Sequence, residues 1–68
     1  MNASVVLKAP EGKFRVVGVD TFDGTDWVNG DYATLEIAKD MARERGGTML
    51  KFHVYDDQGN HLFEAGTF

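Results

Sequence analysis

Residues 34–47 read TLEIAKDMARERGG, and they decide the fold because they predict one amphipathic helix with a defined start and end. Thr34 is a suitable N-cap, and Glu36 lies in the first turn, where the helix dipole favours an anion. Gly46 and Gly47 end the helix. The apolar side chains fall on one arc, and they are Leu35, Ile37, Ala38, Met41 and Ala42. We expect this arc to pack against one face of a sheet.

Two strands are predicted after the helix, joined as a hairpin. Residues 49–55 (MLKFHVY) alternate, so that one face carries Leu50, Phe52 and Val54 and the other carries Lys51, His53 and Tyr55. Residues 56–60 (DDQGN) predict a tight turn with a glycine available for a left-handed position. Residues 61–65 (HLFEA) predict the last strand, in which alternation allows only one of Leu62 and Phe63 to face the helix.

Two strands are also predicted before the helix. Residues 4–8 (SVVLK) and 13–19 (KFRVVGV) are rich in β-branched side chains, which favour strands. The turn between them, residues 9–12 (APEG), combines a proline that fixes φ with a glycine that permits positive φ. Residues 20–31 (DTFDGTDWVNGD) are dominated by Asp, Asn and Gly and predict a loop. The predicted element order is therefore β-β-α-β-β.

This order predicts a single small α+β domain over residues 1–68. Its two layers are a four-stranded, mainly antiparallel sheet and one helix packed on one face. Two sheet arrangements satisfy the connections. In the first, strands 13–19 and 49–55 are parallel neighbours, whereas in the second the last strand inserts between them. We favour the second, because a sheet with one uncovered face is usually antiparallel. With the predicted strands 4–8, 13–19, 49–55 and 61–65 numbered 1 to 4, its strand order is 1-2-4-3.

Composition argues against several classes of function. The chain has 68 residues, a net charge of −4 and no cysteine. The lack of cysteine excludes disulfides and cysteine-ligated zinc, and the acidic balance argues against nucleic-acid binding. Apolar runs are only a few residues long, so no membrane partner is expected. Residues 1–13 lack the basic start and long apolar stretch of a secretory signal, and we expect a cytoplasmic protein.

Catalysis and cofactor binding are not expected either. The chain contains no glycine-rich phosphate cradle, and no serine or threonine stands near a histidine in a known catalytic motif. A domain of this size also has little room for a pocket that excludes water. We therefore expect a non-enzymatic protein without a cofactor.

The leading functional prediction is a protein-interaction module. The sheet face that the helix leaves uncovered is predicted to be mixed, with apolar residues at its centre, as is typical of a partner surface. We expect this face to bind a protein partner through Val17, Val19, His53 and Tyr55. The partner is either a different protein or a second copy of the chain, since a homodimer would help so small a domain to reach stability.

Trp27 is the only tryptophan and has two interpretations. An exposed tryptophan is typical of the anchor of an interface, which would add Trp27 to the interaction residues. Alternatively, Trp27 folds back over one end of the core and seals the helix start with Val28 and Tyr32, because a small domain rarely leaves its largest apolar side chain unused.

The alternative functional prediction is binding of Ca²⁺ at an acidic rim. Both sheet arrangements gather six aspartates at one rim, namely Asp20, Asp23, Asp26, Asp31, Asp56 and Asp57. Calcium takes hard oxygen ligands from flexible loops, so Asp23, Asp26, Asp56 and Asp57 are its candidate ligands. Their spacing does not match an EF-hand loop, and we favour the interpretation that they stabilise turns.

The two histidines are a weaker candidate for a metal site. His53 and His61 are predicted on consecutive strands, and two histidines with a carboxylate can hold a metal ion. They flank the turn eight positions apart, so their side chains need not share a face. We interpret them as solvated surface residues.

Two segments resemble a group of small uncharacterised bacterial domains. The segments are DYATLEIAK (residues 31–39) and FHVYDDQGN (residues 52–60). The shared outline is an opening strand, a helix that starts T-L-E-x-A-K and a hairpin with D-D-x-G at its tip, and it covers residues 13–66. The resemblance implies a bacterial cytoplasmic protein with the fold described above, and it carries no functional residues across.

Overall fold

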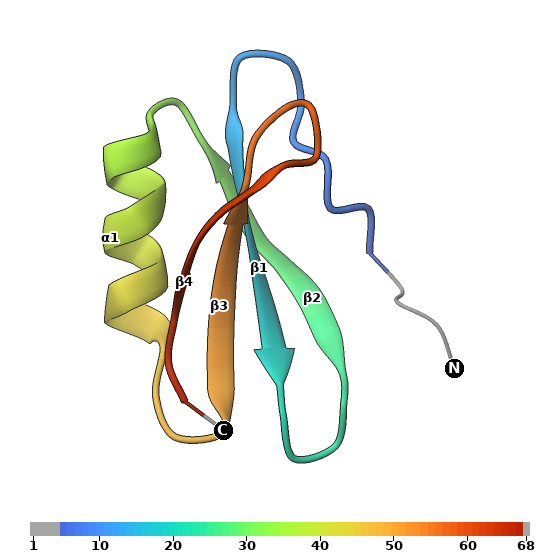
Figure 1. The fold of residues 1–68 in the computed structure, drawn as a ribbon, viewed down its shortest axis with the longest axis vertical. Helices are drawn as coiled ribbons and strands as arrows, with labels where there is room; N and C mark the ends of the chain where they lie inside the picture. The colour runs from blue at the N-terminus through green and yellow to red at the C-terminus, as the bar shows by residue number, and fades with distance from the viewer. Residues whose placement is uncertain (1–4, 68) are drawn as a thin grey trace.

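The computed structural model describes residues 5–67 as one four-stranded sheet with a helix on one face (Figure 1). The strands are β1 (Phe14–Asp20), β2 (Asp26–Tyr32), β3 (Leu50–Tyr55) and β4 (His61–Ala65), and α1 (Leu35–Arg45) links β2 to β3. The sheet order is β2-β1-β3-β4, and all neighbouring strands are antiparallel. The predicted fold class, a two-layer α+β domain with β-β-α-β-β order, is confirmed.

The helix begins and ends where the sequence predicts. The Thr34 side chain accepts a hydrogen bond from the Ile37 backbone N–H at 3.2 Å, and the Gly46 N–H donates to the Ala42 carbonyl at 2.9 Å. Ala38 and Ala42 are completely buried, and their small side chains let the helix lie close to the sheet. Ile37, at the edge of the predicted apolar arc, remains 45% exposed.

The core lies between α1 and the sheet face that the alternation predicts. Its buried cluster consists of Val16, Ala38, Ala42, Phe52 and Val54, with partly buried side chains such as Phe14 and Leu50 around it. From β4, Phe63 packs against this cluster, and Leu62 stays 40% exposed beside a bulge. The choice between Leu62 and Phe63 is thereby decided in favour of Phe63.

The strand predicted over residues 4–8 is wrong. Residues 5–8 form no strand, and Ser4 lies outside the described residues. The segment is instead fixed by single hydrogen bonds: the Ala9 N–H donates to the Asp56 carbonyl at 3.0 Å, and an Arg15 nitrogen donates to the Val6 carbonyl at 2.8 Å. The turn at residues 9–12 is confirmed by a hydrogen bond from the Lys13 N–H to the Pro10 carbonyl at 2.9 Å.

The loop predicted over residues 20–31 is also wrong, because its second half, residues 26–31, belongs to β2. A tight turn with Gly24 at φ +80° joins β1 to β2, and the Asp20 N–H donates to the Thr25 carbonyl at 2.8 Å. β2 is an edge strand with a bulge at Asn29, between the pairs Val16–Gly30 and Val17–Val28. Edge strands tolerate Asp, Asn and Gly because one side of the ladder is unpaired, and Tyr32 packs against the core.

The extra strand changes the topology of the sheet. β2 reverses the chain before α1, so β3 runs antiparallel to β1 and pairs with it directly, with Arg15 opposite Tyr55 and Asp20 opposite Leu50. Both predicted arrangements are therefore wrong: the neighbours are not parallel, and β4 is not inserted between them. The predicted order 1-2-4-3 is wrong because it omits β2, and with it one reversal of the chain between β1 and the helix.

Candidate functional site

The sheet face opposite α1, called the outer face below, differs from the predicted interaction surface. Val17 lies at its centre, opposite both Val28 and His53, but is only 1% exposed. Val19, His53 and Tyr55 are half-buried. The predicted location of these residues on one face is confirmed, whereas Val17 offers no surface to a partner.

Part of the outer face is tied to the N-terminal segment by Arg15. Its guanidinium makes a two-pronged ion pair with Asp31, at 2.7 and 3.0 Å, and a third bond to the Val6 carbonyl at 2.8 Å. A bidentate pair of this kind fixes the guanidinium plane and raises the pKa of Arg15. Residues 5–9 are thereby held beside this face, which leaves less of it open than the predicted topology implies.

Trp27 lies on the helix side of the sheet. It stands opposite Gly18 on β1, and Gly18 in turn stands opposite Phe52 on β3. The two aromatic rings meet above the glycine edge to face, with centroids 5.9 Å apart and planes at 84°. Trp27 therefore covers one end of the core while remaining 37% exposed. It does not seal the helix start with Val28 and Tyr32, because Val28 points to the outer face beside Val17.

Three large apolar side chains remain exposed where β1 ends and β3 begins: Phe22 at 80%, Met49 at 44% and Trp27 at 37%. We call these three residues the apolar end. Phe22 is in the β1–β2 turn, and a hydrogen bond from the Thr21 N–H to the Met49 carbonyl at 2.9 Å joins that turn to the residue before β3 (Figure 1). The sequence places Met49 in a strand, but its backbone adopts φ +64°.

The six aspartates do not share a rim, which corrects the acidic-rim prediction. Asp23 and Asp26 are at the end of the sheet where Asp20 pairs with Leu50. Asp56 and Asp57 follow β3 at the opposite end, where Tyr55 pairs with Arg15 (Figure 1). The full length of β1 separates the two pairs, so one calcium ion cannot be held by all four carboxylates.

The aspartates stabilise turns. Asp23 accepts from the Thr25 N–H at 3.0 Å, and Asp57 accepts from the Gly12 N–H at 2.9 Å. One Asp56 oxygen accepts from the N–H groups of Gln58 and Asn60, at 2.9 and 2.8 Å. These backbone bonds favour the ionised forms and lower the pKa of Asp23 and of Asp56, with the Thr25 and Asn60 bonds as the largest causes.

The Asp56 turn predicts a specific acid sensitivity. Because the folded pKa of Asp56 lies below its ordinary value of 3.8, its stabilisation is complete at higher pH and is lost as the pH falls through 3.8 and below. Asp56→Asn keeps an acceptor oxygen but cannot titrate. We expect the wild type to melt higher than this variant at neutral pH, and the difference to shrink between about pH 4 and pH 2.

Thermal melts of both proteins across this range test the prediction. Glu44→Gln, on an exposed position of α1, controls for the loss of one negative charge and should show no comparable narrowing. A difference between wild type and Asp56→Asn that stays constant down to pH 2 would contradict the assignment.

Three side chains of the β3–β4 hairpin converge on the outer face: His53, His61 and Glu64. His53 Nδ1 lies 3.0 Å from His61 Nε2, and Glu64 Oε1 lies 3.6 Å from the first nitrogen and 3.9 Å from the second. The ligand atoms of these three side chains all lie within 4.8 Å of one another. Among residues 5–67, this is the one group of three or more His, Cys, Asp or Glu side chains that lie so close together. The two histidines therefore share one face of the hairpin, where His61 is exposed and His53 is half-buried.

The charge states of this cluster follow from its surroundings. Lys51 Nζ donates to Glu64 Oε2 at 2.9 Å, and this bond lowers the pKa of Glu64. Burial lowers the pKa of His53, and the neighbouring His61 lowers it further. Near neutral pH the carboxylate is therefore ionised, and His53 is a neutral imidazole with a lone pair on one nitrogen.

Strict alternation hides this cluster from sequence analysis. His61 and Glu64 are three residues apart, so a regular strand would turn them to opposite faces. The bulge at Leu62, between the pairs Val54–Phe63 and Tyr55–His61, restores both to the outer face. The sequence alone leaves open whether Leu62 or Phe63 faces the helix, so it carries no signal for this bulge.

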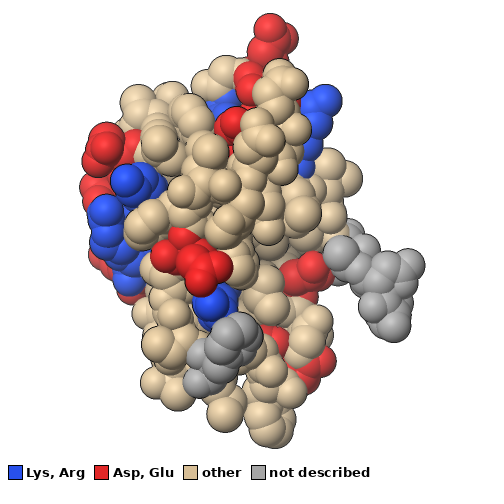
Figure 2. All heavy atoms as spheres, viewed as in Figure 1, with Lys and Arg blue, Asp and Glu red and all other residues tan. Residues whose placement is uncertain are grey.

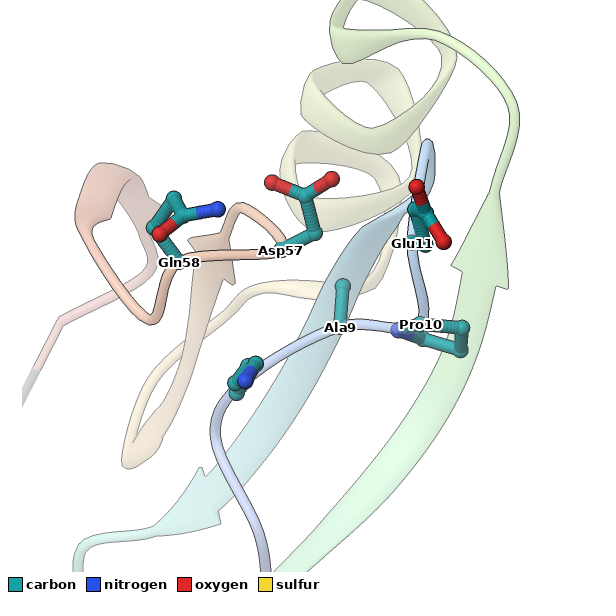
Figure 3. A pocket seen from close by; sticks show the side chains of 6 residues that line it. Ala9, Pro10, Glu11, Asp57 and Gln58 are labelled. Atoms are coloured by element: carbon teal, nitrogen blue, oxygen red, sulfur yellow. The ribbon is translucent and has the colours of Figure 1, made fainter.

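A pocket of about 440 Å³ lies between the β3–β4 turn and residues 8–11 of the N-terminal segment (Figure 3). It is lined by Lys8, Ala9, Pro10, Glu11, Asp57 and Gln58. In Figure 3 the carboxyl groups of Glu11 and Asp57 stand on either side of Ala9. Since Asp57 already accepts from the Gly12 N–H, we assign its carboxylate to holding the N-terminal segment rather than to a ligand.

Comparison with protein-family models, with curated proteins and with solved structures found no match to this chain. Within the part of the chain that the structure describes, no helix has the length and apolar character needed to cross a bilayer. The functional argument therefore depends on the geometry of the described residues.

Proposed function

We propose that the protein is a non-enzymatic interaction module that binds a partner protein at the apolar end. The observation that carries this proposal is the exposure of Phe22, whose side chain is 80% accessible at the tip of a tight turn. Exposed aromatic and methionine side chains at one end of a domain are typical of interface anchors. The proposal keeps Trp27 from the predicted interaction residues and moves the interface away from Val17, Val19, His53 and Tyr55.

Backbone strain at Met49 supports the same surface. Among the described residues, Met49 is the one non-glycine residue with a positive φ, and its side chain is 44% exposed. Such a conformation costs a residue with a Cβ about 1–3 kcal/mol, and strain of this kind concentrates at functional sites. A glycine or asparagine would serve the turn better, so the methionine side chain is better explained by a contact outside the domain.

Charge selects the partner that fits. The turn that carries Phe22 also carries Asp20, Asp23 and Asp26, with no Lys or Arg in residues 20–26. In Figure 2, acidic side chains are visible over the lower part of β2, and basic side chains gather mainly over α1. The chain as a whole has a net charge of −4, which repels a second copy. The partner is therefore a different protein with a segment that combines apolar and basic side chains.

Selection of peptides from a random display library tests the proposal. We expect wild-type protein to enrich peptides that combine Lys or Arg with an aromatic or long aliphatic residue. Phe22→Ala and Met49→Asn should each lower the affinity for the selected peptides at least tenfold, which is the size of effect typical of a hot-spot residue. Met49→Asn should leave the free energy of unfolding unchanged or raise it, because asparagine tolerates positive φ.

Ile37→Ala is the matched control, because Ile37 is an equally exposed apolar residue on α1, at 45%. It should bind the selected peptides like the wild type. Peptides that bind Phe22→Ala with full affinity, or a library that yields none, would refute the proposed surface. A concentration-dependent dimer in light scattering, lost in Phe22→Ala, would replace the foreign partner with a second copy. A cytoplasmic location is part of the same proposal, since it follows from the bacterial resemblance.

A further inference from the structure

We propose that His53, His61 and Glu64 form a binding site for a divalent transition-metal ion, with Zn²⁺ as the ion that suits the donor set. The site is on the outer face of the β3–β4 hairpin. Its three ligands belong neither to the turn aspartates nor to the apolar end, so the site does not depend on the proposed partner.

The spacing of the donor atoms matches a tetrahedral ion. Zinc binds imidazole nitrogen and carboxylate oxygen at about 2.0–2.1 Å, so two ligands of a tetrahedral ion lie about 3.3 Å apart. The three separations in the cluster are 3.0, 3.6 and 3.9 Å and lie around this value.

Hydrogen bonding joins the two imidazoles of the cluster but not the Glu64 Oε1 atom that faces them. The two facing imidazole nitrogens can share one proton, which explains their 3.0 Å approach. Glu64 Oε1, at 3.6 and 3.9 Å, is too far from either nitrogen for a hydrogen bond. A cation between the three atoms would bind all of them at once and would replace the shared proton.

The cluster is held in place by its supports. His53 stands directly opposite Glu64, and Tyr55 stands opposite His61, so a paired hairpin fixes all three ligand positions. Lys51 binds Glu64 Oε2 and leaves Oε1 turned toward the histidines. Lys51 is therefore a positioning residue that orients the ligand without touching the ion.

The donor set also selects the class of ion. Two imidazoles and one carboxylate suit zinc, copper and nickel, whereas calcium and magnesium take oxygen ligands almost exclusively. Three protein ligands leave one position of the tetrahedron open to water or to another donor.

Calorimetric titration of the purified protein with ZnCl₂ tests the site. We expect one ion bound per chain, and we expect His61→Gln and Glu64→Gln each to weaken binding at least tenfold. Lys51→Met should weaken it by about tenfold, because Glu64 loses the contact that orients it. Asp57→Asn, on the turn of the same hairpin, is the control and should bind zinc like the wild type, and Ca²⁺ should give no response.

Nitrogen-detected NMR of the two imidazole rings identifies the ligand atoms in the unmodified protein. Zinc should shift His53 Nδ1 and His61 Nε2, the two nitrogens that face each other, more than the other ring nitrogens. Absence of binding at millimolar zinc, shifts at the opposite nitrogens or full affinity in His61→Gln would each overturn the proposal. Because the shifts are measured on the wild type, the result holds even where a variant fails to fold.

Discussion

Replacing Phe52 with alanine is expected to lower the free energy of unfolding by about 3–5 kcal/mol. Phe52 is 3% exposed, belongs to the buried cluster under α1 and supports the edge of the Trp27 ring. A domain of this size is stable by about 3–10 kcal/mol, so the variant should be largely unfolded or close to it. Urea titration followed by far-UV circular dichroism measures the loss without relying on Trp27 fluorescence, which the substitution itself would alter.

The matched control is Phe22→Ala, which removes the same atoms from a side chain that is 80% exposed. Its free energy of unfolding should stay within about 0.5 kcal/mol of the wild type. Equal losses in the two variants would mean that Phe52 is not part of the core. The pair also separates stability from binding, since Phe22→Ala is expected to lose the partner while remaining folded.

The second large effect is expected at Gly18, where alanine should lower the free energy of unfolding by about 1–3 kcal/mol. A Cβ at this position would lie 2.7 Å from Trp27 and 2.8 Å from Phe52, so the two rings that meet above the glycine must move apart. Trp27 should be the ring that moves, because it is already 37% exposed whereas Phe52 is 3% exposed. Since Trp27 is the only tryptophan, fluorescence reports its movement directly. Its fluorescence emission should shift to the red as its contact with Phe52 is lost.

Two comparisons test this explanation. Gly47→Ala should be close to neutral, because a Cβ there meets nothing within 4 Å. In a Trp27→Ala background, the effect of Gly18→Ala should be smaller, since one of the two clashing rings is gone. An undiminished effect in that background would show that the Trp27 ring is not what makes Gly18 necessary.

The part of the fold that the sequence predicts correctly is the part with regular patterns. The helix is bounded by Thr34 and Gly46, and β3 alternates cleanly between Phe52 and His53, so their local signals agree with the tertiary structure. β2 fails because its composition favours a loop and its stability comes from tertiary contacts of Trp27 and Tyr32. The Asp23-Gly24 pair is a hairpin signal inside the segment predicted as a loop.

The error over one strand explains most of the error over the site. Without β2, the chain direction at β3 is reversed, and Asp56 and Asp57 are assigned to the end that Asp23 occupies. The histidine cluster fails for a different reason, because a bulge of one residue changes the face of everything beyond it. Neither a bulge nor the pairing of an edge strand can be read from alternation alone, since both depend on neighbouring strands.

The two bulges have a further consequence for the behaviour of the domain in a crowded solution. One interrupts β2 at Asn29 and the other interrupts β4 at Leu62, and these are the two outer strands of the sheet. An open sheet is a template on which other chains can add strands, and irregular edges block this growth. Each molecule therefore ends its own sheet on both sides. We therefore expect the domain to resist edge-to-edge growth into fibres, even though its sheet never closes.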